Sequence, residues 1–118
     1  MAAKDELGRR GEAVAANWFE QHGYVVVERN WRCRAGEIDL VLSRGETTVF
    51  AEVKTRTSVA YGHPFEAITA QKTRRLRRLA AEWCRQNAPG AECIRIDAVA
   101  VVDAWSAIPR VEHLSGIA

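Results

Sequence analysis

The chain has 118 residues, of which 47% are hydrophobic and 27% are charged, the composition of one ordinary globular domain. We therefore expect a single domain over residues 1–118, and the formal net charge of +2 marks it as neither strongly acidic nor strongly basic. No apolar run is long enough to span a membrane, and the first residues lack the apolar stretch of a signal peptide. These features argue against membrane-spanning and secreted classes and predict a cytoplasmic protein.

The first quarter of the chain predicts a helix, a strand and a basic loop. The helix is expected over about residues 4–22, where apolar and small residues recur at helical spacing, and Gly23 is a natural end. The stripe comprises Leu7, Gly11, Val14, Ala15 and Trp18. Residues 24–28 (YVVVE) form a continuous apolar run typical of a strand buried on both faces. Residues 29–36 (RNWRCRAG) are expected to form a loop or an irregular edge.

A β-hairpin is expected next, because residues 37–42 and 48–54 both alternate apolar with other side chains. Gly45-Glu46 between them suits a two-residue type II′ turn. With this turn, one face carries the apolar pairs Leu42–Val49, Leu40–Ala51 and Ile38–Val53. The other face carries Val41–Phe50, Asp39–Glu52 and Glu37–Lys54. Opposed carboxylates in a sheet are destabilising, so Asp39 facing Glu52 indicates a cation held between them.

The second half predicts a helix and one or two further strands. After a loop at 55–64 and a short helical stretch from Pro64, Thr69 is a candidate N-cap for a helix over about 70–87. Residues 93–102 predict a strand, and residues 110–114 a short edge strand. The order α-β-β-β-α-β, with a last β, implies a parallel strand pair joined by a helical crossover. The expected fold class is α/β, a mixed sheet flanked by helices.

Two carboxylates and a lysine are expected to converge on one face of the hairpin. Glu52 and Lys54 are two residues apart and share a face, and Asp39 joins them across the strands. Oxygen ligands suit Mg²⁺, or Mn²⁺, and such an ion polarises a phosphoryl oxygen and activates water. The backbone carbonyl of Val53 is a further candidate ligand, and Glu12 of the first helix could complete the site. The alternative is a solvated face on which Glu52 and Lys54 form a weak surface pair.

This arrangement resembles the PD-(D/E)XK nuclease superfamily, notably its archaeal Holliday-junction resolvase branch. The pattern is D-x12-E-V-K on a hairpin, preceded by a helix that carries a glutamate. Nearly the whole chain is similar to the YraN-like family of small bacterial proteins. The matching stretches are GRRGEAVAANWFEQHGY at 8–24, RNWRCRAGEIDLV at 29–41, VFAEVKTRTS at 49–58, FEAITAQKTRRL at 65–76, IRIDAVAV at 94–101 and EHLSGIA at 112–118.

The resemblance implies a restriction-endonuclease-like fold and a Mg²⁺- or Mn²⁺-dependent endonuclease that hydrolyses phosphodiester bonds. It carries the catalytic positions onto Glu12, Asp39, Glu52 and Lys54, with Asp39, Glu52, Glu12 and the carbonyl of Val53 at the metal. Ile38 stands where the superfamily name has proline, which leaves the carboxylate of Asp39 in place. The alternative is a module on the same fold that binds nucleic acid or recruits a partner without cleaving.

Positive charge is concentrated on the second predicted helix, where residues 72–85 carry many arginines against the single acid Glu82. Cations along a helix can meet successive phosphates, so nucleic acid, with DNA as the expected kind, is the predicted partner. The candidate contacts are Arg56, Gln71, Lys72, Arg74, Arg75 and Arg78. A solvated face is the alternative.

Three further residues or segments carry weaker expectations. Trp31, among the arginines of 29–36, could stack on a base, although packing in the core is the more common role for a tryptophan. Asp97, in a predicted interior strand, is expected to be a structural acid paired with an arginine. The apolar strand at 98–102 and the tail offer a surface for a homodimer.

Overall fold

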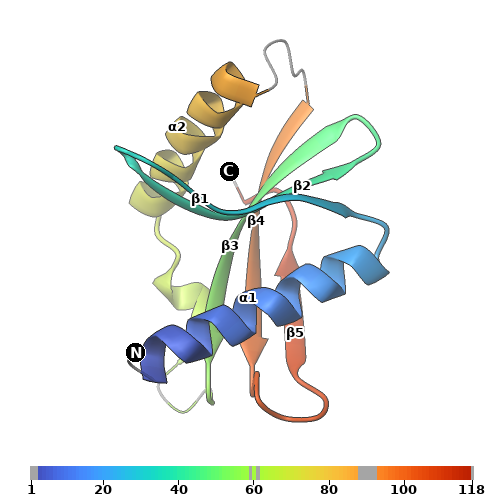
Figure 1. Ribbon diagram of the computed structural model, residues 1–118. Coiled ribbons are helices and arrows are strands. Elements are labelled where there is room, and N and C mark those ends of the chain that lie inside the picture. Colours follow the sequence, from blue (N-terminus) through green and yellow to red (C-terminus); the bar gives the residue numbers. More distant parts are fainter. Residues whose placement is uncertain (1–2, 59, 61, 88–92, 118) are drawn as a thin grey trace.

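The computed structural model describes residues 3–58, 60, 62–87 and 93–117. Its elements follow the order α-β-β-β-α-β-β, which confirms the expected α/β class (Figure 1). They are α1 (Ala3–Gln21), β1 (Val25–Cys33), β2 (Gly36–Arg44), β3 (Thr47–Arg56), the 3-10 helix η1 (Pro64–Ala67), α2 (Ala70–Asn87), β4 (Cys93–Val102) and β5 (Arg110–Leu114). No helix in the described part of the chain is long and apolar enough to cross a membrane.

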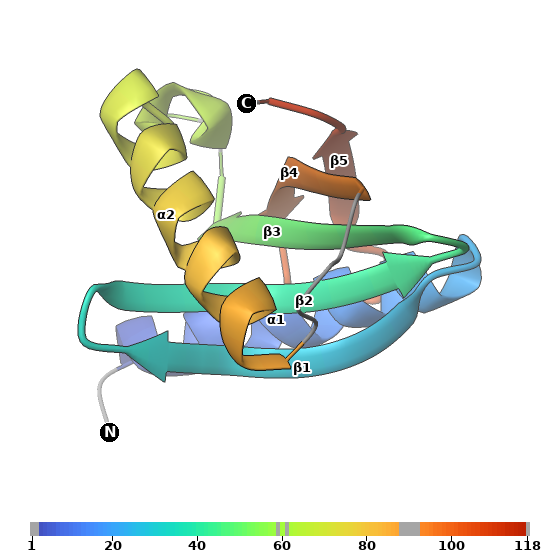
Figure 2. The same cartoon turned by 90° about the horizontal axis from the view of Figure 1, so that it is seen from above.

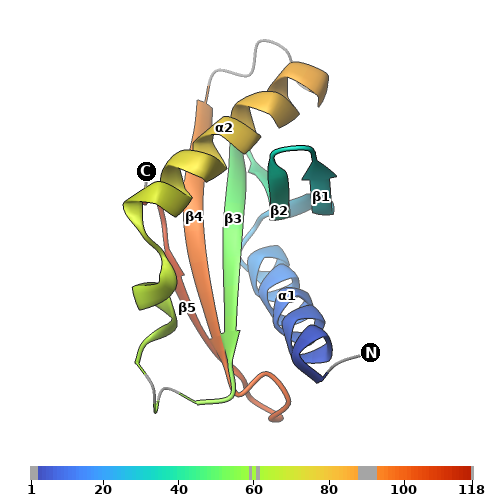
Figure 3. The ribbon, with the colours of Figure 1, turned by 90° about the vertical axis from the view of Figure 1, so that its left-hand side faces the viewer.

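The five strands form one sheet in the order β1-β2-β3-β4-β5. β3 and β4 are parallel, and the other neighbouring pairs are antiparallel. Parallel neighbours need a long crossover, which η1 and α2 supply, as the sequence predicts. α1 lies on one face of the sheet and α2 on the other (Figure 3).

Each helix covers its own hydrophobic cluster. The α1 cluster contains Phe19, Leu40, Leu42, Val49, Ala51 and Val99 among its buried residues. The α2 cluster contains Trp31, Ile38, Val41, Phe50 and Ile96 together with the predicted helix stripe Leu76, Leu79, Ala80 and Trp83. Because strand residues alternate between the faces, the central strands are apolar on both sides.

The β2–β3 hairpin has the predicted turn, and the predicted register holds as far as Leu40–Ala51; Asp39–Glu52 and Glu37–Lys54, predicted to face each other, are not strand pairs. Gly45 has a φ of +60° whereas Glu46 is not among the non-glycine residues with positive φ, the pattern of a type II′ turn. The pairs run from Arg44–Thr47 to Leu40–Ala51. The prediction that Ile38 shares a face with Val53 is wrong, since Ile38 lies in the α2 cluster. Beyond Leu40 the β1–β2 turn extends away from β3 (Figure 2), and the two strands no longer pair there.

Strand β1 differs from its prediction in length and in burial. It runs on through the predicted loop to Cys33 and lies at the edge of the sheet, so Val25 and Val27 are 63% and 47% exposed. An apolar run indicates a strand but does not tell an edge strand from an interior one. Trp31 is only 9% exposed and packs in the α2 cluster, so its role is core packing.

The prediction that residues 98–102 offer a surface for a homodimer is also wrong, while its other part, a contact through the tail, stays a prediction. These residues are at most 4% exposed, and β4 is paired with β3 on one side and β5 on the other. A strand enclosed in this way has neither a free face nor a free edge for a second subunit.

Helix α1 crosses β3 at Gly11, directly before Glu12. A Cβ added to Gly11 would collide with the Thr55 side chain and lie 2.7 Å from its Cβ. We expect Gly11→Ala to destabilise the protein by about 1–3 kcal/mol through overpacking, as measured by urea unfolding. Gly8→Ala is the matched control, because its Cβ meets nothing within 4 Å; it should be neutral or stabilising by up to about 1 kcal/mol. Equal stability of the two variants would contradict this close contact.

Candidate functional site

The acidic residues gather where β2 separates from β3. Beyond the last β2–β3 pair, Leu40–Ala51, the N–H of Val53 donates to a side chain of β2 and not to its backbone. The acceptor is Asp39 Oδ2, at 2.8 Å. On β3, Lys54 Nζ lies 3.0 Å from Glu52 Oε1, with 21% and 15% of their side chains exposed. Asp39 is thus fixed by the backbone next to a half-buried ion pair.

Three carboxylates converge at this point. Glu12 from α1 and Glu37 and Asp39 from β2 each offer an oxygen, and these oxygens lie within 4.8 Å of one another. Within the described residues this group does not include Glu52, whose carboxylate faces Lys54 instead. Glu37 was not among the residues predicted for the site. A carboxylate set of this kind is the donor chemistry that Mg²⁺ and Mn²⁺ prefer.

The protein holds these acids at an electrostatic cost. Burial, followed by the charge of Glu52, raises the pKa of Asp39 to about 7, against the opposing hydrogen bond from Val53. Burial also raises the pKa of Glu12, with Glu37 and Glu52 adding to the shift. Crowded carboxylates that resist ionisation favour a cation among them.

Strand β1 supplies two residues that hold the outer acids. The Asn30 side chain hydrogen-bonds Glu12, and Asn30 has a φ of +52°, a left-handed conformation that asparagine tolerates better than most residues. Arg32 Nε donates to Glu37 Oε2 at 3.0 Å. Asn30 and Arg32 were not predicted at the acids, because the sequence indicates neither the length of β1 nor its backbone conformation.

A surface hollow of about 200 Å³ opens beside Glu12 and Lys54. Its lining also includes Val53 and Arg56, two further residues predicted for the site. Arg56 is exposed and its guanidinium donates to the carbonyl of Thr55 at 2.9 Å. Glu12 and Lys54 are therefore accessible from a hollow bounded by α1 and the end of β3.

The basic residues of α2 form a separate surface. Thr69 caps the helix as predicted, accepting a hydrogen bond from the Lys72 N–H at 3.2 Å. Gln71, Lys72, Arg75 and Arg78 line one hollow with Thr69, whereas Arg74 is exposed without being part of that lining. Among the described residues this hollow shares none of its lining with the hollow at the acids. The ammonium of Lys72 also donates to the carbonyl of Ala67 at 2.9 Å.

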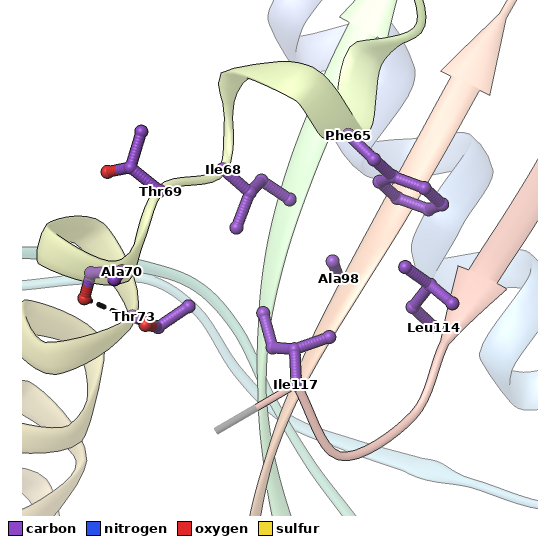
Figure 4. Close-up of a pocket in the computed structure, with 8 residues that line it drawn as sticks. All are labelled: Phe65, Ile68, Thr69, Ala70, Thr73, Ala98, Leu114 and Ile117. Carbon is purple, nitrogen blue, oxygen red and sulfur yellow. Dashed lines mark hydrogen bonds between the residues drawn. The ribbon is translucent and has the colours of Figure 1, made fainter.

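An apolar hollow lies between η1, α2 and the tail (Figure 4). Its described lining residues are Phe65, Ile68, Thr69, Ala70, Thr73, Ala98, Leu114 and Ile117. None of these side chains titrates or binds a metal in the way a carboxylate does. The described lining of this hollow therefore has no group that could act as a catalytic acid, base or metal ligand of the carboxylate kind.

Asp97 is fully buried and belongs to a structural network, as the sequence predicts. Arg95 donates to both of its oxygens, at 2.8 and 2.9 Å. His113 Nε2 lies 2.6 Å from Oδ2, and the N–H of Gly116 donates to Oδ1 at 3.0 Å. Burial opposes ionisation, but these hydrogen bonds outweigh it and lower the pKa of Asp97. The network ties β5 and the tail to β4, away from the acids.

The raised pKa of Asp39 predicts a pH-dependent stability in the absence of metal. An acid whose pKa is higher in the folded protein binds a proton there that the unfolded chain releases, so stability falls as pH rises from about 4 to about 7. Asp39→Asn removes this charge and should stabilise the metal-free protein at pH 8 by up to about 4 kcal/mol. Urea unfolding in chelator at pH 5 and pH 8 measures the difference. If the wild type became more stable relative to Asp39→Asn as the pH is raised from 5 to 8, the raised pKa of Asp39 would be contradicted.

Comparisons with known proteins identify the family to which the chain belongs. Residues 11–101 match the model of the uncharacterised protein family UPF0102. The chain belongs to the UPF0102 family. It is 61% identical to a UPF0102 protein of Leifsonia xyli subsp. xyli, over 99% of each chain. UPF0102 proteins of Arthrobacter sp. (strain FB24) and Frankia casuarinae are 56% and 46% identical, over 99% and 98% of each chain. UPF0102 is the YraN-like family, a member of the restriction-endonuclease-like nuclease superfamily, so the resemblance drawn from the sequence is confirmed.

Proposed function

We propose that this UPF0102 protein is a metal-dependent hydrolase of phosphodiester bonds in nucleic acid, with DNA as its expected substrate. The observation that carries the proposal is the convergence of Glu12, Glu37 and Asp39 within 4.8 Å, beside the Glu52–Lys54 pair. A sheet has no structural need for a cluster of carboxylates in which burial and neighbouring charge raise the pKa of Glu12 and Asp39.

The residues present fit a divalent cation. Glu12, Glu37 and Asp39 would hold it, with Glu52 and the carbonyl of Val53 as further ligands. A bound Mg²⁺ or Mn²⁺ supplies charge that polarises a phosphoryl oxygen and lowers the pKa of water. The Val53 N–H holds one carboxylate oxygen of Asp39, and among the described residues no hydrogen bond to the other oxygen is found, which supports a role in metal binding.

Lys54 provides a cationic group beside Glu52. Its ammonium can donate a hydrogen bond to the attacking water or to a phosphate oxygen where negative charge develops. Arg56, two residues further along β3, can bind a neighbouring phosphate. Gln71, Lys72, Arg74, Arg75 and Arg78 would hold a more distant part of the backbone by salt-sensitive contacts.

A cleavage assay tests the proposal. Single-stranded, duplex and branched DNA, and RNA, are incubated with the protein in Mg²⁺, in Mn²⁺ or in chelator. We expect cleavage that needs metal and is lost in Asp39→Ala and Lys54→Ala. Glu46→Gln is the matched control, because Glu46 is an exposed acid at the turn of the same hairpin, and this variant should retain the wild-type rate.

Two results would contradict the proposal. Cleavage that survives in both site variants indicates a contaminating nuclease. Binding without cleavage in every form and with every metal indicates instead a module that keeps the nuclease fold and only binds nucleic acid.

A further inference from the structure

The loop between β4 and β5, residues 103–109, presents an exposed indole. Trp105 is 64% exposed, and Ile108 in the same loop is 86% exposed. The other tryptophans are buried or half-buried: Trp31 and Trp83 pack in the α2 cluster, and Trp18 packs against the α1 cluster. An exposed tryptophan next to a second exposed apolar side chain is a candidate binding surface, because an indole offers a large area for contact.

Hydrogen bonds tie this loop to α1, which carries Glu12, and to β3, which carries Glu52 and Lys54. Arg10 Nε donates to the carbonyl of Ala104 at 2.8 Å, and Arg10 lies on α1 two residues before Glu12. The N–H of Asp103 donates to the carbonyl of Arg56 at 3.1 Å. The loop thus lies at the same end of the molecule as the N-terminal half of α1 and the end of β3 (Figure 3).

The surroundings of Trp105 match the chemistry of a nucleotide. The guanidinium of Arg10 lies over the indole ring of Trp105, 5.9 Å from its centre. This is a cation–π contact, and it helps to hold the ring in place. Arg10 and Arg56 are exposed cations on the two elements that hydrogen-bond the loop, and cations of this kind suit the phosphates that flank a stacked base. Arg56 is two residues from Lys54, which spans only about 7 Å along a strand.

We propose that Trp105 is a stacking platform for an unpaired nucleobase, so that the substrate carries a single-stranded segment next to the cleaved bond. The position next to a cleaved bond rests on the proposed function, whereas base stacking on Trp105 does not require cleavage. Stacking on an exposed aromatic ring is open to any base with a free face, whereas the bases inside a duplex already stack on one another. The surface therefore distinguishes a single strand, a flap or a branch from continuous duplex.

Binding in chelator tests the platform without requiring cleavage. Fluorescence anisotropy is measured with a labelled single-stranded oligonucleotide and with the closed hairpin duplex of the same sequence. Trp105→Ala should weaken single-strand binding at least about 5-fold and leave duplex binding unchanged. Trp105→Phe keeps a ring and should retain most of the affinity. Ile108→Ala, the matched control from the same loop, should bind as the wild type does.

Several results would overturn the platform. One is a wild type that does not bind the single strand, and another is a loss of affinity in Trp105→Ala that is the same for the single strand and the duplex. Equal affinities of Trp105→Phe and Trp105→Ala for the single strand would also overturn it. A wild-type dimer that Trp105→Ala dissociates in sedimentation experiments would also overturn it, by making the loop a contact between copies. Failure of the two proposals is distinguishable: Trp105-dependent binding without metal-dependent cleavage refutes only the hydrolase, and cleavage with unchanged binding by Trp105→Ala refutes only the platform.

Discussion

Replacing Lys54 by methionine is expected to abolish hydrolysis and, in the same protein, to tighten the binding of Mn²⁺. Lys54 Nζ lies 3.0 Å from Glu52 Oε1, so its charge occupies a carboxylate that a metal would otherwise use. Like charges at contact distance repel by about 1 kcal/mol even in water, and more for a divalent ion, so we expect affinity to rise about fivefold or more. The loss of the ammonium should lower kcat by at least about 100-fold.

Titration calorimetry with Mn²⁺ and the cleavage assay, run on the same preparations, measure the two effects. Asp39→Asn provides the contrast, because it removes a ligand charge and should lower both metal affinity and hydrolysis. A Lys54→Met protein that loses metal affinity would show that Lys54 organises the acids rather than competing for them. Lys54 is 21% exposed, so the variant should remain folded.

Asp97→Ala is expected to have the largest effect on stability, a loss of about 3–5 kcal/mol. The substitution leaves the guanidinium of Arg95 without its bidentate partner and removes the acceptor for His113 and the Gly116 N–H. It also weakens the attachment of the tail to β4, which then depends on the hydrogen bond from the Ile117 N–H to the Ile96 carbonyl. Urea unfolding at pH 7 measures the loss, which is more than a third of the total stability of many domains.

Glu112→Gln is the matched control for Asp97→Ala. Glu112 also pairs with a histidine, His63, at 2.8 Å, but its side chain is 51% exposed. An exposed pair contributes little, so the variant should stay within about 0.5 kcal/mol of wild type. Comparable losses in the two variants would refute the idea that burial gives the Asp97 network its effect.

The hairpin was predictable because several local signals agree. Gly45 permits the positive φ of a type II′ turn, and this turn fixes a register that sorts Leu40, Leu42, Val49 and Ala51 onto one face. The stripe of α2 was predictable for the same reason, since its four apolar residues recur at helical spacing beside a Thr69 cap. Periodicity and turn chemistry act over a few residues and can be seen in a sequence.

The separation of β2 from β3 was not predictable from such signals. It turns Ile38 towards α2, replaces a strand pair by the contact of Asp39 with the Val53 N–H, and brings Glu37 beside Glu12. Glu37 stands two residues before Asp39 on the same expected face, which is the one signal that could have included it. Asn30 gave no comparable signal, because its role depends on a left-handed backbone inside a strand.

The position of β4 in the sheet has a consequence for synthesis on the ribosome. All the groups of the acidic site lie in the first 56 residues, yet β3 gains its second neighbour only when β4, Cys93–Val102, has emerged. Until then the long edge of β3 and the apolar residues beneath it remain open to other chains, and pairing across such a sequence separation is slow. The nascent chain therefore holds every residue of the acidic site before its sheet is complete. Pairing of β4 with β3 then covers the exposed edge and protects the first half of the chain from aggregation.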